Sequence, residues 1–188
     1  MSNYTSLKNH FLIAMPNLAD VNFAQAVTYI CEHSEKGAMG IVINYPLTIH
    51  LGDILKDLNI HADNQETAKI PIFGGGPIQQ DRGFVLHTPD KQKWESTFEL
   101  SDKLSVTTSK DILEAIANNR GPKKSIIALG YAGWGEGQLE KEIAQNSWIS
   151  CPANNEILFN TPSQEIWHAA AKLMGVNLKK MSFDVGHA

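Results

Sequence analysis

Four glycines and two aromatic residues crowd the segment Ala128–Ile143, ALGYAGWGEGQLEKEI. Its strand–glycine–helix order is typical of phosphate-binding loops, because the N-terminus of a helix offers free N–H groups and positive potential. The details disagree with such a loop, since no Lys-Ser or Lys-Thr follows the glycines and Glu136 and Glu140 add negative charge. The alternative is a tight strand-to-helix crossing with Tyr131 and Trp134 packed on a sheet.

A second glycine loop, Gly74-Gly75-Gly76-Pro77, precedes Arg82. An arginine side chain can bind a carboxylate or a phosphate through two hydrogen bonds. The alternative role is a salt bridge to an acid such as Glu136 or Glu140. If both glycine loops lie at the same end of the sheet, they form one concave site. Its candidate ligand-binding residues are Gly74, Gly75, Gly76, Arg82, Tyr131, Gly133, Trp134 and Gly135.

Cys31 and His33 are the candidate catalytic residues. In an extended strand their side chains point the same way, with Cβ atoms roughly 6.5–7 Å apart. A histidine that close could stabilise a thiolate and make Cys31 nucleophilic or sensitive to oxidation. The alternative is an inert core cysteine, because cysteine is among the most often buried residues.

Other common catalytic and metal-binding patterns are absent from the sequence. The histidines show no HExxH spacing, the two cysteines Cys31 and Cys151 show no paired spacing, and no GxSxG motif occurs. We therefore expect no metal, no cofactor and no serine hydrolase activity.

The composition is that of a globular protein. The 188 residues are 43% apolar and 19% charged, with a net charge of −4. The acidic balance disfavours direct DNA contact, and no apolar run approaches the roughly 20 residues that cross a bilayer. We expect a single domain over residues 1–188 and a cytoplasmic location, without a membrane segment.

The elements that position these residues come in strand pairs as often as strands alternate with helices. We expect strands at Phe11–Met15, Ala26–His33, Ala38–Asn44 (ended by Pro46), Ile70–Phe73, Gly83–Thr88, Ser96–Leu100, Leu104–Thr107, Ser125–Tyr131, Ser147–Ser150 and Glu156–Phe159. Helices are expected at Leu51–Leu58, around Ile112–Ile116, at Gly137–Asn146, and from a capping box at Thr161–Gln164 to Gly175. This mixture predicts an α+β fold with a mixed sheet.

Taken in order, several segments resemble the YqgE/AlgH family of small bacterial proteins. They are His10–Pro16, Tyr29–Asn44, Phe73–Pro77, Arg82–His87, Ala128–Ile143 and the terminal Gly186–Ala188. The resemblance implies an α+β domain with a bifurcated or partly barrel-like sheet flanked by helices, in a bacterial cytosolic protein. This chain has Asn44-Tyr45-Pro46 where the family usually has Asn-Arg-Pro, so it lacks an arginine at the end of the hairpin. One branch is labelled a transcriptional regulator.

Three hypotheses for the function follow. The first is a non-catalytic regulatory or binding protein that contacts a small molecule or another protein. The second is a cysteine-based enzyme or redox sensor that uses Cys31. The third is a transcriptional regulator that binds DNA directly. The sequence leaves the ligand, the partner and the oligomeric state open.

Overall fold

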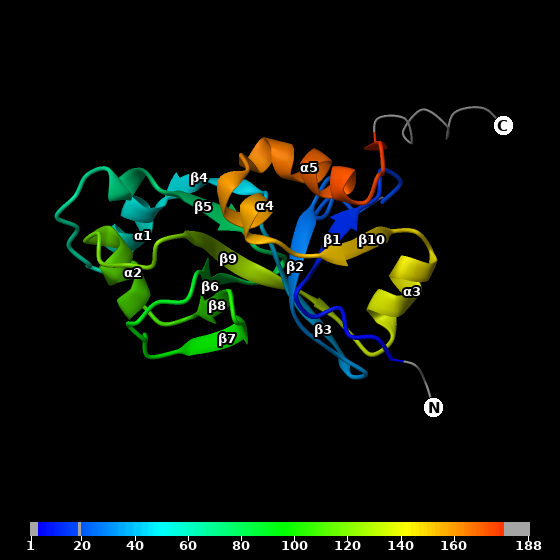
Figure 1. The fold of residues 1–188 in the computed structure, drawn as a ribbon. Coiled ribbons are helices and arrows are strands. Elements are labelled where there is room, and N and C mark those ends of the chain that lie inside the picture. Colours follow the sequence, from blue (N-terminus) through cyan, green and yellow to red (C-terminus); the bar gives the residue numbers. More distant parts are fainter. Residues whose placement is uncertain (1–3, 19, 179–188) are drawn as a thin grey trace.

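The computed structural model describes residues 4–18 and 20–178, so the terminal Gly186–Ala188 lies outside the described residues. Over these ranges the chain forms ten strands and five α-helices (Figure 1). The strands are β1 (His10–Ala14), β2 (Val27–Ser34), β3 (Gly37–Val42), β4 (Pro46–His50), β5 (Pro71–Gly74), β6 (Ile78–His87), β7 (Thr97–Ser101), β8 (Leu104–Thr107), β9 (Ser125–Trp134) and β10 (Trp148–Pro152). The helices are α1 (Leu51–Asp57), α2 (Asp111–Ala117), α3 (Gln138–Ala144), α4 (Asn155–Asn160) and α5 (Ile166–Leu173), with short 3-10 turns at Thr67–Lys69 and Ser163–Glu165.

β9 is the strand at which the sheet divides. Its first half pairs with β5 in parallel and with β6 in antiparallel orientation, and its second half pairs with β3. One branch runs β10-β1-β2-β3-β9, and the other runs β9-β6-β8-β7 with β4 and β5 on the other side of β9. The prediction of an α+β fold with a mixed, bifurcated and partly barrel-like sheet is confirmed.

The glycine loop after β5 crosses β9 in direct backbone contact. The N–H of Gly75 donates to the carbonyl of Leu129 at 2.7 Å. The carbonyl of Gly75 accepts a hydrogen bond from the N–H of Val42, just past the pairing of β3 with β9, at 2.8 Å. This short loop therefore ties both branches together beside β9.

Three glycines permit this contact because no side-chain carbon fits there. A Cβ on Gly75 would lie 2.3 Å from the carbonyl oxygen of Gly130, and one on Gly76 would lie 2.1 Å from the carbonyl carbon of Tyr131. A Cβ on Gly130 would lie 2.5 Å from the carbonyl oxygen of Gly76. The φ angles of +152° at Gly76 and +79° at Gly130 are also ones that other residues rarely adopt.

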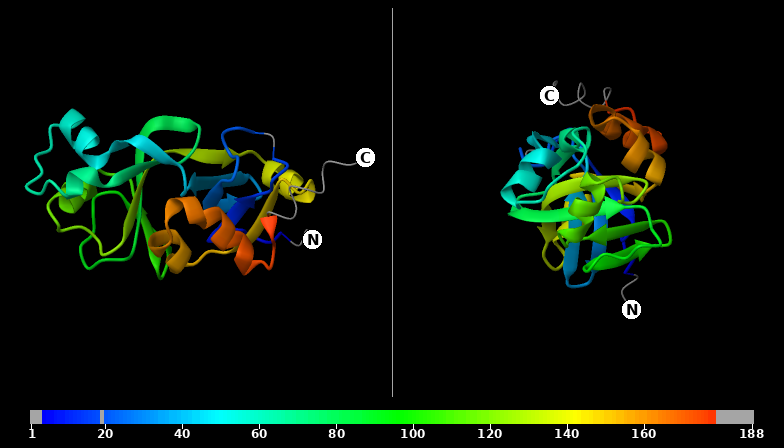
Figure 2. Two further views of the ribbon diagram at one scale, coloured as in Figure 1. Left: turned by 90° about the horizontal axis from the view of Figure 1, so that it is seen from above. Right: turned by 90° about the vertical axis from the view of Figure 1, so that its left-hand side faces the viewer.

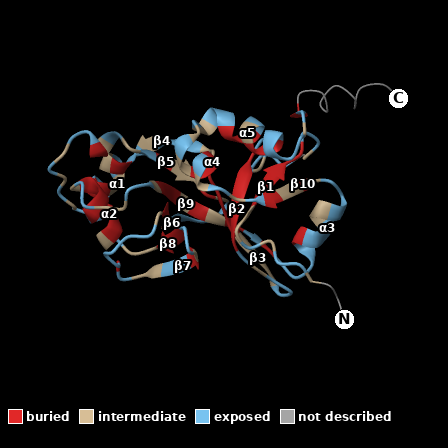
Figure 3. Ribbon diagram, viewed as in Figure 1, coloured by how far each residue is buried: buried red, intermediate tan, exposed pale blue. Residues whose placement is uncertain are grey.

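Helices cover the branches on three sides, and buried clusters lie beneath them. Figures 1 and 2 show α1 and α2 at one end of the molecule and α3 at the other, with α4 and α5 over the β1–β2 region. Figure 3 shows β1 and β2 buried along most of their length, whereas the edge strand β7 is mostly exposed or half-buried.

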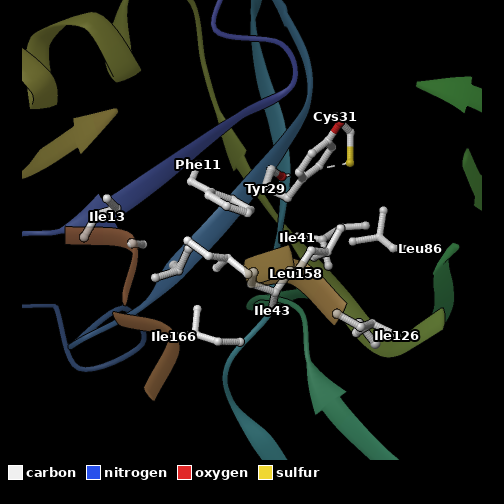
Figure 4. Close-up of a cluster of buried hydrophobic side chains, with 14 of the residues drawn as sticks. Phe11, Ile13, Tyr29, Cys31, Ile41, Ile43, Leu86, Ile126, Leu158 and Ile166 are labelled. Carbon is white, nitrogen blue, oxygen red and sulfur yellow. Dashed lines mark hydrogen bonds between the residues drawn. The ribbon is translucent and has the colours of Figure 1, made fainter. Parts of the chain in front are cut away.

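The largest cluster is the core between the two branches. It joins residues of β1, β2 and β3 with residues of β6, β8 and β9, and α4 and α5 close it through Leu158 and Ile166 (Figure 4). Phe84 and Leu86 of β6 face this core, whereas Val85 faces the cluster under α1 and α2. Side chains therefore alternate between the two faces of the sheet along this part of β6, as expected for a strand.

Several predicted boundaries are wrong. Residues 156–159 are helical in α4 rather than extended, because the side chain of Asn154 caps the helix by accepting from the N–H of Ile157 at 2.8 Å. The strand expected to end at Tyr131 continues to Trp134, because β3 pairs with it there. β3 does end before Pro46, but Pro46 begins the edge strand β4, which was not predicted. The predicted capping box at Thr161 does not form, since this residue ends α4.

Replacing a glycine at the crossing should destabilise the fold. We expect Gly76→Ala to lower the free energy of unfolding by about 2–5 kcal/mol, since it combines overpacking with an unfavourable φ. Urea denaturation monitored by circular dichroism measures the change.

Gly83→Ala is the matched control for this substitution. A Cβ at Gly83 meets no atom within 4 Å, and its φ lies outside the positive range that other residues rarely adopt. The variant should be stabilised by about 0.4–1 kcal/mol, because alanine lowers the entropy of the unfolded chain. Equal effects of the two substitutions would contradict the role assigned to the crossing.

Candidate functional site

A cavity of about 380 Å³ opens between the two branches of the sheet, and we call it the inter-sheet cavity. Its volume falls within the roughly 300–1,000 Å³ of small-molecule sites. The wall is mostly apolar and aromatic, with a few polar groups, which is the usual composition of such sites. The lining residues are Cys31, Glu32, Met39, Gln79, Arg82, Phe84, Phe98, Leu100, Val106, Thr108 and Tyr131.

An irregular stretch of β6 places Arg82 at this cavity. Ile78 pairs with Tyr131, but the next pair joins Gly83 to Leu129, so the intervening residues bulge out of the ladder. Gln79 begins the bulge with a φ of +46°, which is uncommon for a residue other than glycine. Bulges often redirect a side chain beside a functional site.

The guanidinium of Arg82 lies over an aromatic ring with its charge unpaired. Its carbon is 5.4 Å from the centroid of the Phe84 ring, and Nη1 donates to Oε1 of Gln79 at a long 3.4 Å. Arg82 forms no ion pair with any residue in 4–18 or 20–178, so the expected salt bridge to Glu136 or Glu140 is absent. Glu140 pairs with His33 instead.

The aromatic wall of the cavity joins predicted and unpredicted residues. Tyr131, a predicted binding residue, packs edge-to-face on Phe84 with ring centroids 5.7 Å apart. Phe98 of β7 lines the same cavity and is 60% exposed. Phe84 and Phe98 were not predicted as site residues, although the spacing of Phe98 and Leu100 on one face of a strand was a usable signal.

The prediction that Cys31 and His33 share one strand face is wrong. Ile30 pairs with Gly40 and Glu32 with the adjacent Met39, so Cys31 occupies a bulge that breaks the alternation of β2. Cys31 lines the inter-sheet cavity, whereas His33 lines a second cavity of about 510 Å³ beside the β2–β3 hairpin, which we call the hairpin cavity.

The ring of His33 is occupied by other partners. Its Nδ1 accepts from the N–H of Leu7 at 2.9 Å, so Nε2 carries the proton and donates to Oε1 of Glu140 at 2.7 Å. Both nitrogens thus tie the N-terminal segment and α3 to β2.

Cys31 has the environment of a core thiol. It is 2% exposed, packs beside Tyr29 (Figure 4), and its burial raises the pKa of the thiol to about 12. A reactive cysteine instead requires an environment that lowers the pKa of its thiol. The geometry thus gives no support to the catalytic pair, whose role stays a prediction.

Trp134 serves mainly to anchor α3. Its indole N–H donates to Oε2 of Glu142 at 2.8 Å, and the indole N–H of Trp148 donates to the same oxygen at 3.0 Å. The two rings meet edge-to-face at 6.0 Å. Trp134 also lines the hairpin cavity but does not line the inter-sheet cavity.

The structure brings the two glycine loops together without making them the wall of either cavity. Gly75 and Gly76 pack on the backbone of β9, and Gly74, Gly133 and Gly135 line neither the inter-sheet cavity nor the hairpin cavity. The contact between the loop and β9 explains Gly75, Gly76 and Gly130, whereas the strand-to-helix crossing expected in Ala128–Ile143 lies between the end of β9 at Trp134 and the start of α3 at Gln138. The role of these glycines in ligand binding stays a prediction.

The described residues form neither a metal-ligand cluster nor a membrane-spanning helix. Within residues 4–18 and 20–178, no group of three or more histidine, cysteine or acidic residues is arranged to hold a metal ion. In the same part of the chain, no helix combines the length and the hydropathy that a membrane span requires.

Comparisons with known proteins agree with this architecture. A family model described as AlgH-like matches residues 11–179. A UPF0301 protein of Nitrosococcus oceani is 54% identical over 188 residues, which cover 100% of both chains. The solution structure of the AlgH protein from Pseudomonas aeruginosa is similar with a TM-score of 0.80 and 51% identity, covering 100% of this chain and 99% of that one. A crystal structure from Corynebacterium diphtheriae shares the fold with a TM-score of 0.74 at 20% identity, covering 97% and 94% of the two chains.

The buried environment of Cys31 predicts a slow reaction with alkylating reagents. With a pKa of about 12 rather than the ordinary value, the thiolate fraction near pH 8.5 should be about a thousandfold below that of a free thiol. Iodoacetamide labelling of the Cys151→Ser variant, followed by mass spectrometry, isolates Cys31. We expect labelling only after unfolding in guanidinium; rapid labelling of the native protein would instead restore the redox hypothesis.

Proposed function

The chain belongs to the AlgH-like family, and we propose that it is a non-catalytic binding protein for a small molecule that joins an apolar body to an anionic group. One observation carries this proposal: Arg82 presents an unpaired guanidinium at the mostly apolar inter-sheet cavity. The regulatory role of the protein, in this proposal, is exerted through the bound molecule.

The surroundings of Arg82 favour an anion as its missing partner. The ring of Phe84 and the amide of Gln79 orient the guanidinium but do not neutralise it. A carboxylate or phosphate can accept two parallel N–H bonds from one guanidinium, and each charged hydrogen bond contributes about 1.5–3 kcal/mol. The anionic end of a ligand therefore belongs at Arg82.

The rest of the wall favours an apolar body on the same ligand. Phe84, Leu100 and Val106 are buried members of the core between the branches, so the cavity continues that core toward solvent. The exposed ring of Phe98 would lose contact with water when a ligand fills the cavity. Burial of apolar surface would then add to the charge interaction.

The alternative functions have less support. Burial raises the pKa of Cys31, which opposes an enzyme or redox sensor based on its thiolate. Direct DNA binding would require a basic surface, and the net charge of the chain is −4. A cytoplasmic location is part of the proposal and is supported by the two free cysteines, which are common in reducing compartments.

Octanoate and octanamide form a matched pair of probes for this site. They share one alkyl chain, but only octanoate carries the charge that Arg82 would bind. We expect octanoate to bind more tightly than octanamide. Arg82→Ala should lower the affinity for octanoate by about 10- to 150-fold, which corresponds to the loss of one charged hydrogen bond. Isothermal titration calorimetry and ¹H–¹⁵N shifts of the cavity residues measure both effects.

Arg120→Ala is the control, because it removes the same charge from an exposed position outside the cavity. This variant should bind octanoate as the unmodified protein does. Equal affinity for octanoate and octanamide, together with no effect of Arg82→Ala, would contradict the proposal.

A further inference from the structure

A third cavity lies on the opposite face of β6, beneath α1 and α2, and we call it the helix-side cavity. Its volume is about 180 Å³, which is about six times the volume of a water molecule in the liquid. Only a small molecule fits in such a space. Aliphatic side chains from the α1 and α2 regions and from β6 and β9 line most of this cavity. They are Ile54, Leu58, Val85, Leu113, Ile127 and Leu129.

Two opposite charges line the same cavity. Asp81 comes from the bulge of β6, and Lys110 immediately precedes α2. Neither forms an ion pair with another residue of the described part of the chain. Because the cavity is so small, one bound molecule can reach both charges.

Gly83 keeps this space open. It lines the cavity, and a Cβ built on it meets no atom within 4 Å. The glycines of the β9 crossing are required by close contact, but Gly83 is not. A side chain at this position would extend into the cavity rather than into the protein.

We infer that the helix-side cavity is a second binding site, which takes an aliphatic α-amino acid. Asp81 binds the ammonium group, Lys110 binds the carboxylate, and the aliphatic lining accepts the side chain. Both side chains are exposed at the rim of the cavity, so a zwitterion offers an opposite charge to each of them, whereas a ligand with a single charge can pair with only one. Apart from Thr108, which lines both, the helix-side cavity and the inter-sheet cavity have different lining residues, and the only cation among those of the inter-sheet cavity is Arg82.

Leucine and two analogues with one charge each test the assignment. Isoamylamine keeps the ammonium group, and isovalerate keeps the carboxylate. Asp81→Asn should lower the affinity for leucine and isoamylamine by at least about tenfold and leave the affinity for isovalerate unchanged. Lys110→Gln should lower the affinity for leucine and isovalerate by a similar factor. Titrations followed by the ¹H–¹⁵N signals of Gly83, Leu113 and Ile127 measure the affinities.

A blocking variant and two surface controls complete the experiment. Gly83→Leu should abolish leucine binding by filling the cavity, and it should leave octanoate binding at Arg82 intact. Asp102→Asn and Lys103→Gln neutralise exposed charges in the turn between β7 and β8. They should leave the affinities for all three probes unchanged.

Three results would overturn the inference. The first is the absence of any shift at these signals with millimolar leucine. The second is leucine binding that survives Gly83→Leu. The third is a loss of affinity that is the same for all three probes in both charge variants. If Gly83→Leu does not fold, the contrast between Asp81→Asn and Lys110→Gln decides the question alone.

Discussion

The architecture depends on one backbone contact, where Gly75 and Gly76 pass over Gly130 and Tyr131. β9 changes partners at this point, pairing with β5 and β6 before it and with β3 after it. Any side chain here would push the crossing strands apart. The contact lets the two branches diverge from a shared strand, so their inner faces enclose the main core and the inter-sheet cavity at its edge.

Two bulges then decide which side chains reach which cavity. The bulge at Cys31 separates its thiol from His33, so that two residues two positions apart line different cavities. The bulge in β6 continues into a regular alternation. Arg82 and Phe84 line the inter-sheet cavity, and Asp81, Gly83 and Val85 line the helix-side cavity. One short segment therefore supplies a cation to one face of the sheet and an anion to the other.

The sequence could predict what depends on local pattern. The faces of Phe84 and Val85 follow from alternation, and the α+β class follows from the order of apolar runs and from the family resemblance. It proposed Arg82 and Tyr131 for one concave site, but it could not predict the bulge that brings Arg82 there, because the positive φ of Gln79 occurs without a glycine to signal it. Nor could it tell that the glycines of Ala128–Ile143 meet those of the other loop, since that contact joins segments about fifty residues apart.

The inter-sheet cavity is lined by a positively charged arginine and by a cysteine whose environment disfavours the thiolate. A catalytic cysteine needs a neighbouring group that stabilises its thiolate. Here burial raises the pKa of Cys31, and the ring of His33 is fully engaged by Leu7 and Glu140. Arg82, by contrast, is oriented over Phe84 and carries an unneutralised charge at an apolar wall. Such a guanidinium can hold the anionic end of a ligand, but it is always protonated and cannot take up a proton during a reaction. The residues that the two bulges bring to this cavity therefore agree with the binding function proposed above.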